Sequence, residues 1–447
     1  MKNVKKAMIL ILVFSFSFLR YKTYVKRKRL AIIFGILSVA FTLSQFYRVS
    51  SAVIAPSLIL ELKLDAKSLG ILGSAFFYSF ALLQIPMGIL LDRFGPRIVM
   101  SIFPAIAAIG AFVFAVSHQF KTLLLGRLLL GVGMSAALMG SLKVFVIAFP
   151  SDRFATFSGL LLSFGTLGNI LASSPLAYLD LVIGWRFAFI VLAIITFIVS
   201  VALWIALGGL NENAGGTFIH PKPKDTFLAI CKNLSFWQVG SLAFFRYGTF
   251  VAMQGLWFGP YLVHIKGFTP ILAGNIIMML SFGVIVGSTL AGYITDRVLK
   301  SPKKGVIIGV SLYALSILFF TGVLDIKSPF SFFLIFFLVG LFNSFGILVY
   351  SHIRNLFPSQ VSGTVMSSVN FFTMAGGAFF MQVMGDLIHL FREKDGLYPP
   401  NAYHAAFFFC FLGVCFSLLF YGFSRTELKE SFLSGNSNFR SGRGDHD

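Results

Sequence analysis

Acidic residues are scarce in this chain: 16 Asp and Glu stand against 36 Lys and Arg, and charged residues make up only 12% of the sequence. Hydrophobic residues account for 57%. A soluble protein of 447 residues cannot hide so much apolar surface inside ordinary domains. The composition therefore excludes a soluble protein and indicates one that is embedded in a lipid bilayer.

Cysteine is almost absent as well. Cys231, Cys410 and Cys415 are odd in number and scattered, which excludes a disulfide framework and a metal site built on cysteine spacing. The chain has no Walker phosphate loop, so it does not hydrolyse ATP to drive movement. It also lacks a His-Glu-x-x-His pair, a Gly-x-Ser-x-Gly elbow and clustered carboxylates, which argues against a membrane enzyme. We expect neither a cofactor nor a metal.

Long apolar runs dominate what remains. A helix needs about 20 apolar residues to cross the hydrocarbon core of a bilayer. Twelve segments reach that length, and they cover residues 30–56, 68–91, 98–117, 122–149, 155–179, 186–208, 237–263, 270–295, 305–324, 329–353, 361–391 and 403–424. The predicted fold class is therefore an all-α multi-pass membrane protein with twelve transmembrane helices.

The basic residues lie mostly on one side of the predicted membrane. If the N-terminus is cytoplasmic, the inward segments hold 24 of the 36 basic residues. By the positive-inside rule, this asymmetry predicts a protein of the plasma (inner) membrane with both termini in the cytoplasm. The location of the charges also argues against nucleic-acid binding, although the net charge is +20.

Residues 1–29 form a basic extension that imitates a signal peptide, because lysines precede the apolar run 7–19. No small-residue cleavage site follows. The run reaches only about 20 Å as a helix. A crossing there would also put six basic residues outside, against the positive-inside rule. We therefore expect a cytoplasmic extension, and an upstream start that is not native is the alternative.

A linker divides the chain into two similar halves. Residues 209–236 form the longest inner loop, which has no hydrophobic pattern and is predicted to be a cytoplasmic linker. Residues 30–208 and 237–425 each contain six spans and share glycines and charges at corresponding positions. We predict two pseudo-symmetric six-helix bundles with a binding site between them near mid-membrane. Residues 426–447 are expected to form a disordered cytoplasmic tail.

Two inner loops carry nearly the same motif, GILLDRFGPR at 88–97 and GYITDRVLK at 292–300. The first resembles the signature loop of the major facilitator superfamily, and the second resembles the reduced copy that this family usually has. The resemblance covers essentially residues 30–425 and implies the major facilitator fold. It also implies a latch between the halves on the inner side, formed by Gly88, Asp92, Arg93, Gly95, Arg97, Gly292, Asp296 and Arg297. An ordinary charged turn that caps two helices is the structural alternative.

Four basic residues lie inside otherwise apolar spans: Arg48, Arg127, Lys143 and Arg246. A charge in the middle of a span costs at least about 2.5 to 3.5 kcal/mol, so each is expected to face a cavity or a partner. Acidic partners are nearly missing from the central part of the spans. We therefore predict that an anionic substrate supplies the negative charge.

The first span carries a further resemblance. The stretch from Tyr47 through LGILGSAFFYSFALLQIPMGILLDRFG resembles the anion:cation symporter branch of the superfamily, where a Tyr and an Arg near the middle of the first helix engage an organic anion. The resemblance implies that Tyr47 and Arg48 contact the substrate. A guanidinium offers a two-pronged fit to carboxylate or phosphate. The branch usually has an acid just before that Arg, a position that Tyr47 occupies here.

The other cations have structural alternatives. Arg127 opens RLLLGVGMS, which resembles the fourth-helix motif of the superfamily, but it could instead bond backbone carbonyls in a packed helix pair. Lys143 and Arg246 either face the cavity or extend toward the lipid headgroups. Gln254, Asn343 and Tyr350 are further candidate substrate contacts, with helix–helix packing as the alternative.

Proton coupling normally needs a titratable group in the path, and the candidates are His352 and Asp386. The fifth span lacks the Gly-Pro pair that family antiporters often carry, so drug or proton antiport is less favoured. Symport, exchange and uniport all remain open at this point.

The leading hypothesis is a secondary transporter that moves a small organic anion by rocking one half against the other around a central cationic site. Its partners would be the small-molecule substrate, a co-transported proton or cation and the lipid bilayer, and we expect a monomer. An amino acid, peptide or nucleoside carrier of the same fold is one alternative. A non-transporting membrane sensor is the other.

Overall fold

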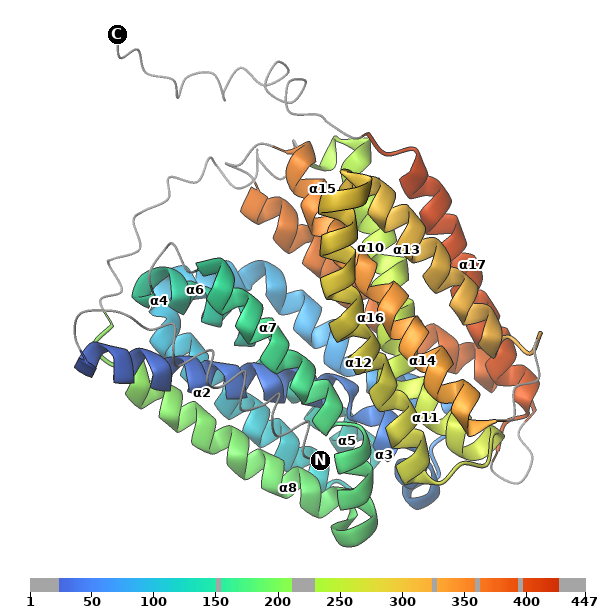
Figure 1. Ribbon diagram of the computed structural model, residues 1–447. Helices are drawn as coiled ribbons and strands as arrows, with labels where there is room; N and C mark the ends of the chain where they lie inside the picture. The colour runs from blue at the N-terminus through green and yellow to red at the C-terminus, as the bar shows by residue number, and fades with distance from the viewer. Residues whose placement is uncertain are drawn as a thin grey trace.

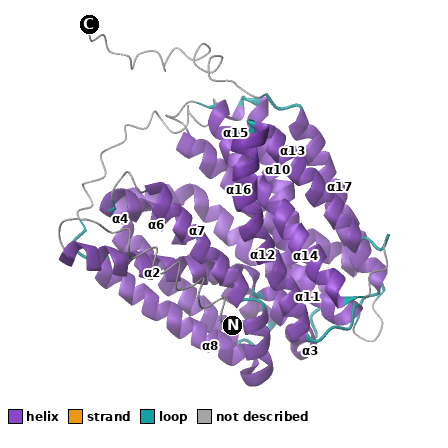
Figure 2. Cartoon of the chain, viewed as in Figure 1, coloured by secondary structure: helices purple, strands orange, loops and turns teal. Residues whose placement is uncertain are grey.

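The computed structural model describes residues 24–149, 154–210, 230–323, 328–357, 362–392 and 397–425. This part of the chain is helical and contains no β-strand (Figure 2). Most of the predicted extension, most of the predicted linker and the predicted tail lie outside the described residues.

The N-terminal half contains six helical segments. They are α2 (Tyr24–Val49) with α3 (Ser51–Leu62), the two parts of α4 (Ala66–Val116), α5 (Phe120–Met134) with α6 (Ala137–Ala148), α7 (Phe154–Leu171) with the start of α8 (Ser174–Ala206), and the rest of α8. Helices α4 and α8 are each divided by a glycine in the left-handed region, Gly95 at φ 74° and Gly184 at φ 77°. Side chains other than glycine's rarely adopt this φ, so these glycines are where the chain leaves one span and enters the next.

The C-terminal half also contains six segments. They are α10 (Leu234–Ala252) continued by η3 (Met253–Trp257), α11 (Phe258–Pro260) and η4 (Tyr261–Ile265); α12 (Pro270–Ile294) with η5 (Thr295–Leu299); α13 (Pro302–Ile317) with η6 (Leu318–Phe320); α14 (Pro329–Ser344) with η7 (Phe345–Ile347) and α15 (Leu348–Leu356); α16 (Ser362–His389); and α17 (Pro400–Gly422). The predicted fold class, twelve spans in two bundles of six, is confirmed.

Ten helices in the described ranges are by themselves long and apolar enough to cross a membrane. The other two spans are each divided into shorter pieces. The fifth breaks where Ala172 and Ser173 separate α7 from α8, with a proline in the first turn of α8. The seventh is interrupted by the wide π turns η3 and η4. These local breaks explain why a length criterion alone undercounts the spans.

Each bundle gathers its chain end and its inner loops at one end, which we call the terminal end. In the first bundle, the Arg29 guanidinium donates to the carbonyl of Gly208. In the second, the carbonyls of Ser424 and Arg425 accept hydrogen bonds from Lys303 and His352. We call the opposite end of each bundle the far end. In Figure 1 the bundles converge at the far end, near α3 and α11, and diverge toward the terminal end.

The two halves pack against each other through small residues. A Cβ added to Gly70 on α4 would lie 2.9 Å from the carbonyl oxygen of Met381, and one added to Gly385 on α16 would lie 2.6 Å from that of Ala66. On the other side of the molecule, a Cβ on Gly274 of α12 would lie 3.0 Å from the Cα of Ser174. The far ends of the halves therefore meet with backbone almost directly against backbone.

Candidate functional site

Arg48 joins the two halves partway along the first span. It lies in the last turn of α2, where the first span breaks before continuing as α3, and its side chain is only 7% exposed. The Nη1 atom donates to the hydroxyl of Tyr247 on α10 at 2.9 Å. The guanidinium carbon lies 5.0 Å from the centre of the Phe80 ring, and Nε has no hydrogen-bond partner among the described residues. Arg48 therefore points out of its own bundle toward the other half.

Arg246 occupies the matching position on the other side. It is 5% exposed, and its Nη1 donates to both the backbone carbonyl and the side-chain oxygen of Asn343, each at 3.0 Å. The guanidinium lies directly over Gly346, where an added Cβ would be 2.2 Å from Cζ. A side chain at position 346 would displace this arginine, so glycine is required here. As with Arg48, Nε of Arg246 has no hydrogen-bond partner in the described part of the chain.

Neither arginine has a carboxylate partner within the described residues. The ion pairs there are Lys143–Asp92, Arg186–Glu61 and His389–Asp65, and all three lie away from mid-membrane. A buried cation without a counterion is unfavourable unless polar groups or an incoming anion compensate it. The aromatic and amide groups around Arg48 and Arg246 supply part of that compensation, and unused N–H groups remain.

Further polar side chains surround the two arginines. Asn370 on α16 donates to Gln84 on α4 at 3.0 Å, which forms another polar contact between the halves. Tyr350 and Thr373 interact through their hydroxyl groups within the C-terminal half. We call Arg48, Gln84, Arg246, Tyr247, Asn343, Tyr350, Asn370 and Thr373 the central cluster.

Four members of the central cluster are missing from the candidates predicted by sequence: Gln84, Tyr247, Asn370 and Thr373. Gln84 stands alone in an apolar run, and Tyr247 directly follows Arg246. Each carries the signal that identified the others, a polar group inside a span. What the sequence does not contain is the rotation of each helix, which decides whether such a group faces the other half or a neighbour in its own bundle.

Tyr47 and Arg127 lie on the other side of the first span from Arg48. The Tyr47 hydroxyl bonds with that of Thr196 at 2.9 Å, inside the N-terminal bundle, and the residue is fully buried. Arg127 is also fully buried, and its Nη1 donates to the Tyr47 carbonyl at 3.1 Å. The geometry around Arg127 matches the structural alternative, an arginine bonded to a carbonyl in a packed helix pair, and neither residue joins the central cluster.

Lys143 lies with the first inner loop instead of the central cluster. Its Nζ is 2.5 Å from Oδ1 of Asp92, and both side chains are partly exposed at the terminal end. Gln254 is buried in the π turn η3. Its neighbour Gly255 packs against the backbone of Arg48. The backbone of the turn therefore contacts the first span, and the Gln254 side chain contributes less to this contact.

The predicted latch residues make their described contacts within their own half. Arg97 donates from Nε to the carbonyl of Trp204 at 3.1 Å and lies over the Trp204 ring, while Arg93 is exposed. A Cβ on Gly88 or on Gly292 would meet no atom within 4 Å, so no helix in the described ranges packs closely against either position. Arg297 is exposed, and the side chain of Asp296 lies outside the described part of the structure.

The two proton-coupling candidates have different surroundings. His352 is buried at the terminal end, where Nε2 lies 3.0 Å from the carbonyl of Arg425 and Nδ1 lies 2.6 Å from the hydroxyl of Tyr421. A carbonyl only accepts, so Nε2 carries the proton and Nδ1 accepts from the tyrosine. This arrangement satisfies the neutral ring fully. Asp386 is half-buried on α16 and lies near Tyr78 of the other half.

The far end is closed by a contact between Asp65 and His389, whose Oδ2 and Nδ1 atoms are 3.6 Å apart. Asp65 also caps α4, because its Oδ1 accepts from the backbone N–H of Ser68 at 2.8 Å. Burial opposes ionisation of Asp65, but the hydrogen bonds from Ser68 and the nearby positive charges outweigh it and lower the pKa of the carboxyl. Asp65 is therefore a charged link between the two halves.

Twelve spans in two bundles, joined at mid-membrane by a cluster with one arginine from each half, define a multi-pass membrane protein of the two-bundle carrier architecture. The sequence comparisons agree with this class. The chain belongs to the Major Facilitator Superfamily, whose family model matches residues 36–381.

Relatives within the superfamily are distant. The chain is 31% identical over 175 residues to the uncharacterized transporter YybO of Bacillus subtilis, which covers 38% of this chain and 39% of the relative. It is 24% identical to the probable sulfoacetate transporter SauU of Cupriavidus necator, covering 60% and 65%. It is 23% identical to the hexuronate transporter of Bacillus subtilis, covering 64% and 70%. The chain thus spans 39% and 65% of the length of the first two relatives.

Solved structures share the fold at low sequence identity. A bacterial homolog of the human lysosomal transporter Spinster, in an inward-facing and unoccupied conformation, superposes with a TM-score of 0.70 at 17% identity, covering 92% of this chain and 99% of the other. The D-xylose-proton symporter gives the same TM-score at 13% identity, covering 89% and 98%. At this identity the likeness shows the fold alone.

Proposed function

We propose that this protein is a secondary transporter that carries a small organic anion, a carboxylate or a phosphate ester, across the membrane by alternating access. Its relatives support an anionic substrate, since they are named for sulfoacetate, hexuronate, galactarate or D-glucarate, and hexose phosphate. All of these solutes carry negative charge at neutral pH. The lipid bilayer and a small-molecule substrate are accordingly the expected partners.

The observation that carries the proposal is that Arg48 and Arg246 both lie beside Tyr247: Arg48 donates to its hydroxyl, and the guanidinium carbon of Arg246 is 5.8 Å from its ring centre. Each half contributes one guanidinium to the central cluster, and neither meets a carboxylate in the described residues. An anion between them accepts charge-assisted hydrogen bonds from both halves at once. It also removes the repulsion between two buried cations. Substrate binding would therefore draw the halves together.

Alternating access requires that the halves separate at one end at a time. Polar contacts between the halves run from Asp65–His389 at the far end to Gln84–Asn370. The position of Gln84, ten residues before Phe94, leaves about 15 Å of helix beyond that contact toward the terminal end. We interpret this conformation as open toward the terminal end, which the positive-inside rule places in the cytoplasm.

The proposed latch would form only in the opposite conformation. As the terminal ends approach, Asp92, Arg93 and Arg97 would exchange or add to their present contacts. A neighbouring helix would then fill the open space beside Gly88 and Gly292. The same role is proposed for Gly95, Asp296 and Arg297. Lys143 belongs to this machinery through its ion pair with Asp92.

Coupling to a proton or another cation is part of the proposal. Asp386 is the better candidate, because it lies on α16 at the interface between the halves, near Tyr78. His352 is held between Tyr421 and the end of the chain, which favours a structural role.

Uptake by purified protein in proteoliposomes tests the proposal. The panel should contain sulfoacetate, D-glucarate, a hexuronate and a hexose phosphate, with a nucleoside and a neutral amino acid as comparison solutes, at several pH values. We expect uptake of at least one anion, and a loss of tenfold or more in R48Q and R246Q, because each removes a charge-assisted contact. R354Q, which removes an exposed arginine at the terminal end, is the matched control.

Thermal unfolding of each variant separates a lost site from a lost fold. Wild-type uptake by a folded R48Q variant would remove Arg48 from the site. Uptake of the neutral solutes alone would overturn the anionic substrate class.

A further inference from the structure

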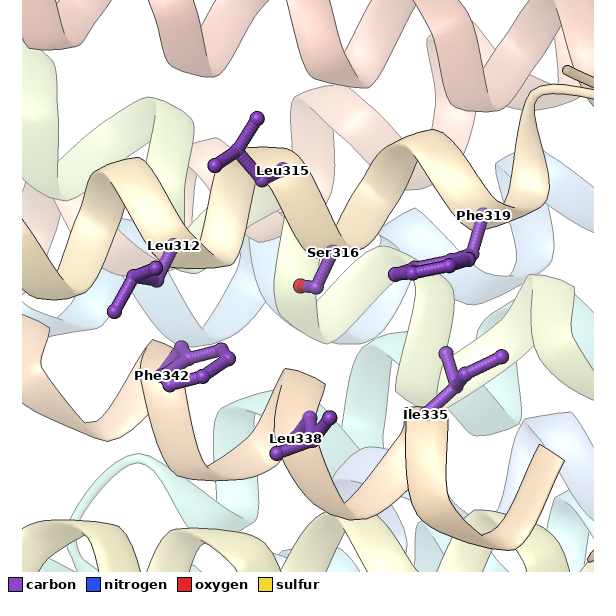
Figure 3. Close-up of a pocket in the computed structure, with 7 residues that line it drawn as sticks. All are labelled: Leu312, Leu315, Ser316, Phe319, Ile335, Leu338 and Phe342. Atoms are coloured by element: carbon purple, nitrogen blue, oxygen red, sulfur yellow. The ribbon is translucent and has the colours of Figure 1, made fainter. Parts of the chain in front are cut away.

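A second polar pocket lies outside the central cluster, at the terminal end of the C-terminal half. It occupies about 350 Å³ between the start of α10 and the end of α17. Its lining side chains are Lys232, Asn233, Leu234, Ser235, Gln238, Phe423 and Arg425. The hollow between α13 and α14 in Figure 3 is different in kind, because apart from Ser316 every side chain that lines it is apolar.

The pocket offers positive charge without a counterion. Lys232 and Arg425 are exposed cations, and neither takes part in an ion pair within the ranges that the structure describes. The pocket also opens at the N-terminus of α10, a helix of 19 residues, where unpaired backbone N–H groups and the helix dipole favour an anion. Asn233 occupies the cap position by accepting from the backbone N–H of Ser235.

Gln238 is the independent sign that the pocket has a polar ligand. Its side chain lines the pocket and is 2% exposed, yet no hydrogen bond to it is found in the described residues. Buried amides are normally paired, and this amide reaches the pocket. An amide group that faces a cationic pocket can donate to an anion bound there.

Apolar side chains surround the pocket on the membrane side. Phe423 is 83% exposed, and Leu234 and Trp237 are also exposed. The indole Nε1 of Trp237 is fixed by a hydrogen bond to the carbonyl of Cys231 at 2.8 Å. Tryptophan and other aromatic residues at the end of a span are typical of the boundary between lipid chains and headgroups.

We propose that this pocket binds the phosphate group of an anionic phospholipid, with its acyl chains lying along Phe423, Leu234 and Trp237. Lys232 and Arg425 pair with the phosphate, and Gln238 donates to one of its oxygens. The site requires nothing from the proposed transport function. Inorganic phosphate shares the same chemistry but would gain nothing from the apolar surface.

A bound headgroup would stabilise the C-terminal half. The backbone N–H of Arg425 already donates to Ser235 at 3.2 Å, so the pocket lies where the end of the twelfth span meets the start of the seventh. A phosphate held by Lys232 and Arg425 would strengthen that junction. Lipid binding should therefore be visible as an increase in thermal stability.

The test uses full-length protein, stripped of lipid in detergent, and measures bound lipid by native mass spectrometry and the melting temperature by tryptophan fluorescence. The probes are phosphatidylglycerol, phosphatidylcholine and inorganic phosphate. The variants are the pair K232Q/R425Q and the single change Q238E, which places a carboxylate in the pocket at nearly constant shape. The control pair K304Q/R354Q removes the same charge from exposed positions outside the pocket.

We expect phosphatidylglycerol to bind and raise the melting temperature of the wild type and of the control pair, and phosphatidylcholine to do so more weakly. K232Q/R425Q and Q238E should bind phosphatidylglycerol about tenfold more weakly or worse, since each basic residue near a membrane surface contributes appreciably to anionic lipid binding. Equal binding by the wild type and both pocket variants would overturn the proposal. Stabilisation by inorganic phosphate that equals that of the lipid would overturn the assignment to a lipid.

Discussion

Replacing Gly346 with alanine should weaken anion transport without unfolding the protein. The new Cβ would lie 2.2 Å from the guanidinium carbon of Arg246, whereas Cβ contacts shorter than 3.0 Å essentially never occur. The guanidinium must therefore move by about 0.8 Å. Because the atoms in conflict belong to the end of a flexible side chain, the arginine yields and the backbone stays in place.

The size of the effect follows from the contacts that Arg246 would lose. Its two hydrogen bonds to Asn343 are 3.0 Å long, and a movement of this size takes them beyond the normal range. Hydrogen bonds to a charged group contribute about 1.5 to 3 kcal/mol. If binding of the substrate has to return Arg246 to its wild-type position, the affinity for the substrate falls by roughly 10- to 100-fold.

The assay measures uptake into proteoliposomes of the anion that the wild type carries best. The quantity compared between variants is the substrate concentration that gives half-maximal uptake. G35A is the matched control, because a Cβ on Gly35 meets no atom within 4 Å. R246Q sets the upper limit of the effect. A G346A variant that keeps the wild-type half-saturation value and melting temperature would show that the position of Arg246 does not matter for binding.

Two other predictions concern the far end. G259A would place a Cβ 1.6 Å from the carbonyl oxygen of Ala52 in the opposite half, so the far ends should separate; spin-label distances across the far end should lengthen, and an unchanged distribution would contradict the packing described. The pKa of Asp65 is lowered by folding, so its contribution to stability is present above its ordinary pKa of 3.8 and lost as the pH falls through the lower folded value. Thermal unfolding should therefore show a loss of stability below about pH 4 in the wild type that is smaller in D65N, and identical profiles would exclude the carboxylate as the cause.

Much of the architecture could be predicted because apolar length and repetition are written directly in the sequence. Twelve spans and two halves follow from them, and so does the burial of Arg48 and Arg246. The contact between Lys143 and Asp92 could not be predicted. The two residues are 51 positions apart in the sequence and lie on different helices, whose relative rotation depends on packing.

Tyr47 and Arg48 show the same limit within one helix. Neighbouring residues on a helix point about 100° apart. Arg48 therefore reaches Tyr247 in the other half, while the Tyr47 hydroxyl meets Thr196 in its own bundle. A motif that names both residues does not say which one faces outward, and that choice is made only when six helices pack together.

The glycines that bring α4 against α16 have a mechanical consequence. Where Gly70 and Gly385 meet, backbone atoms of the two helices are in direct contact, with the Trp257 ring beside them. We expect such a contact to act as a fixed point about which the bundles turn. Rotation about that fixed point moves the terminal ends of the bundles through a much longer arc than the helices at the joint itself.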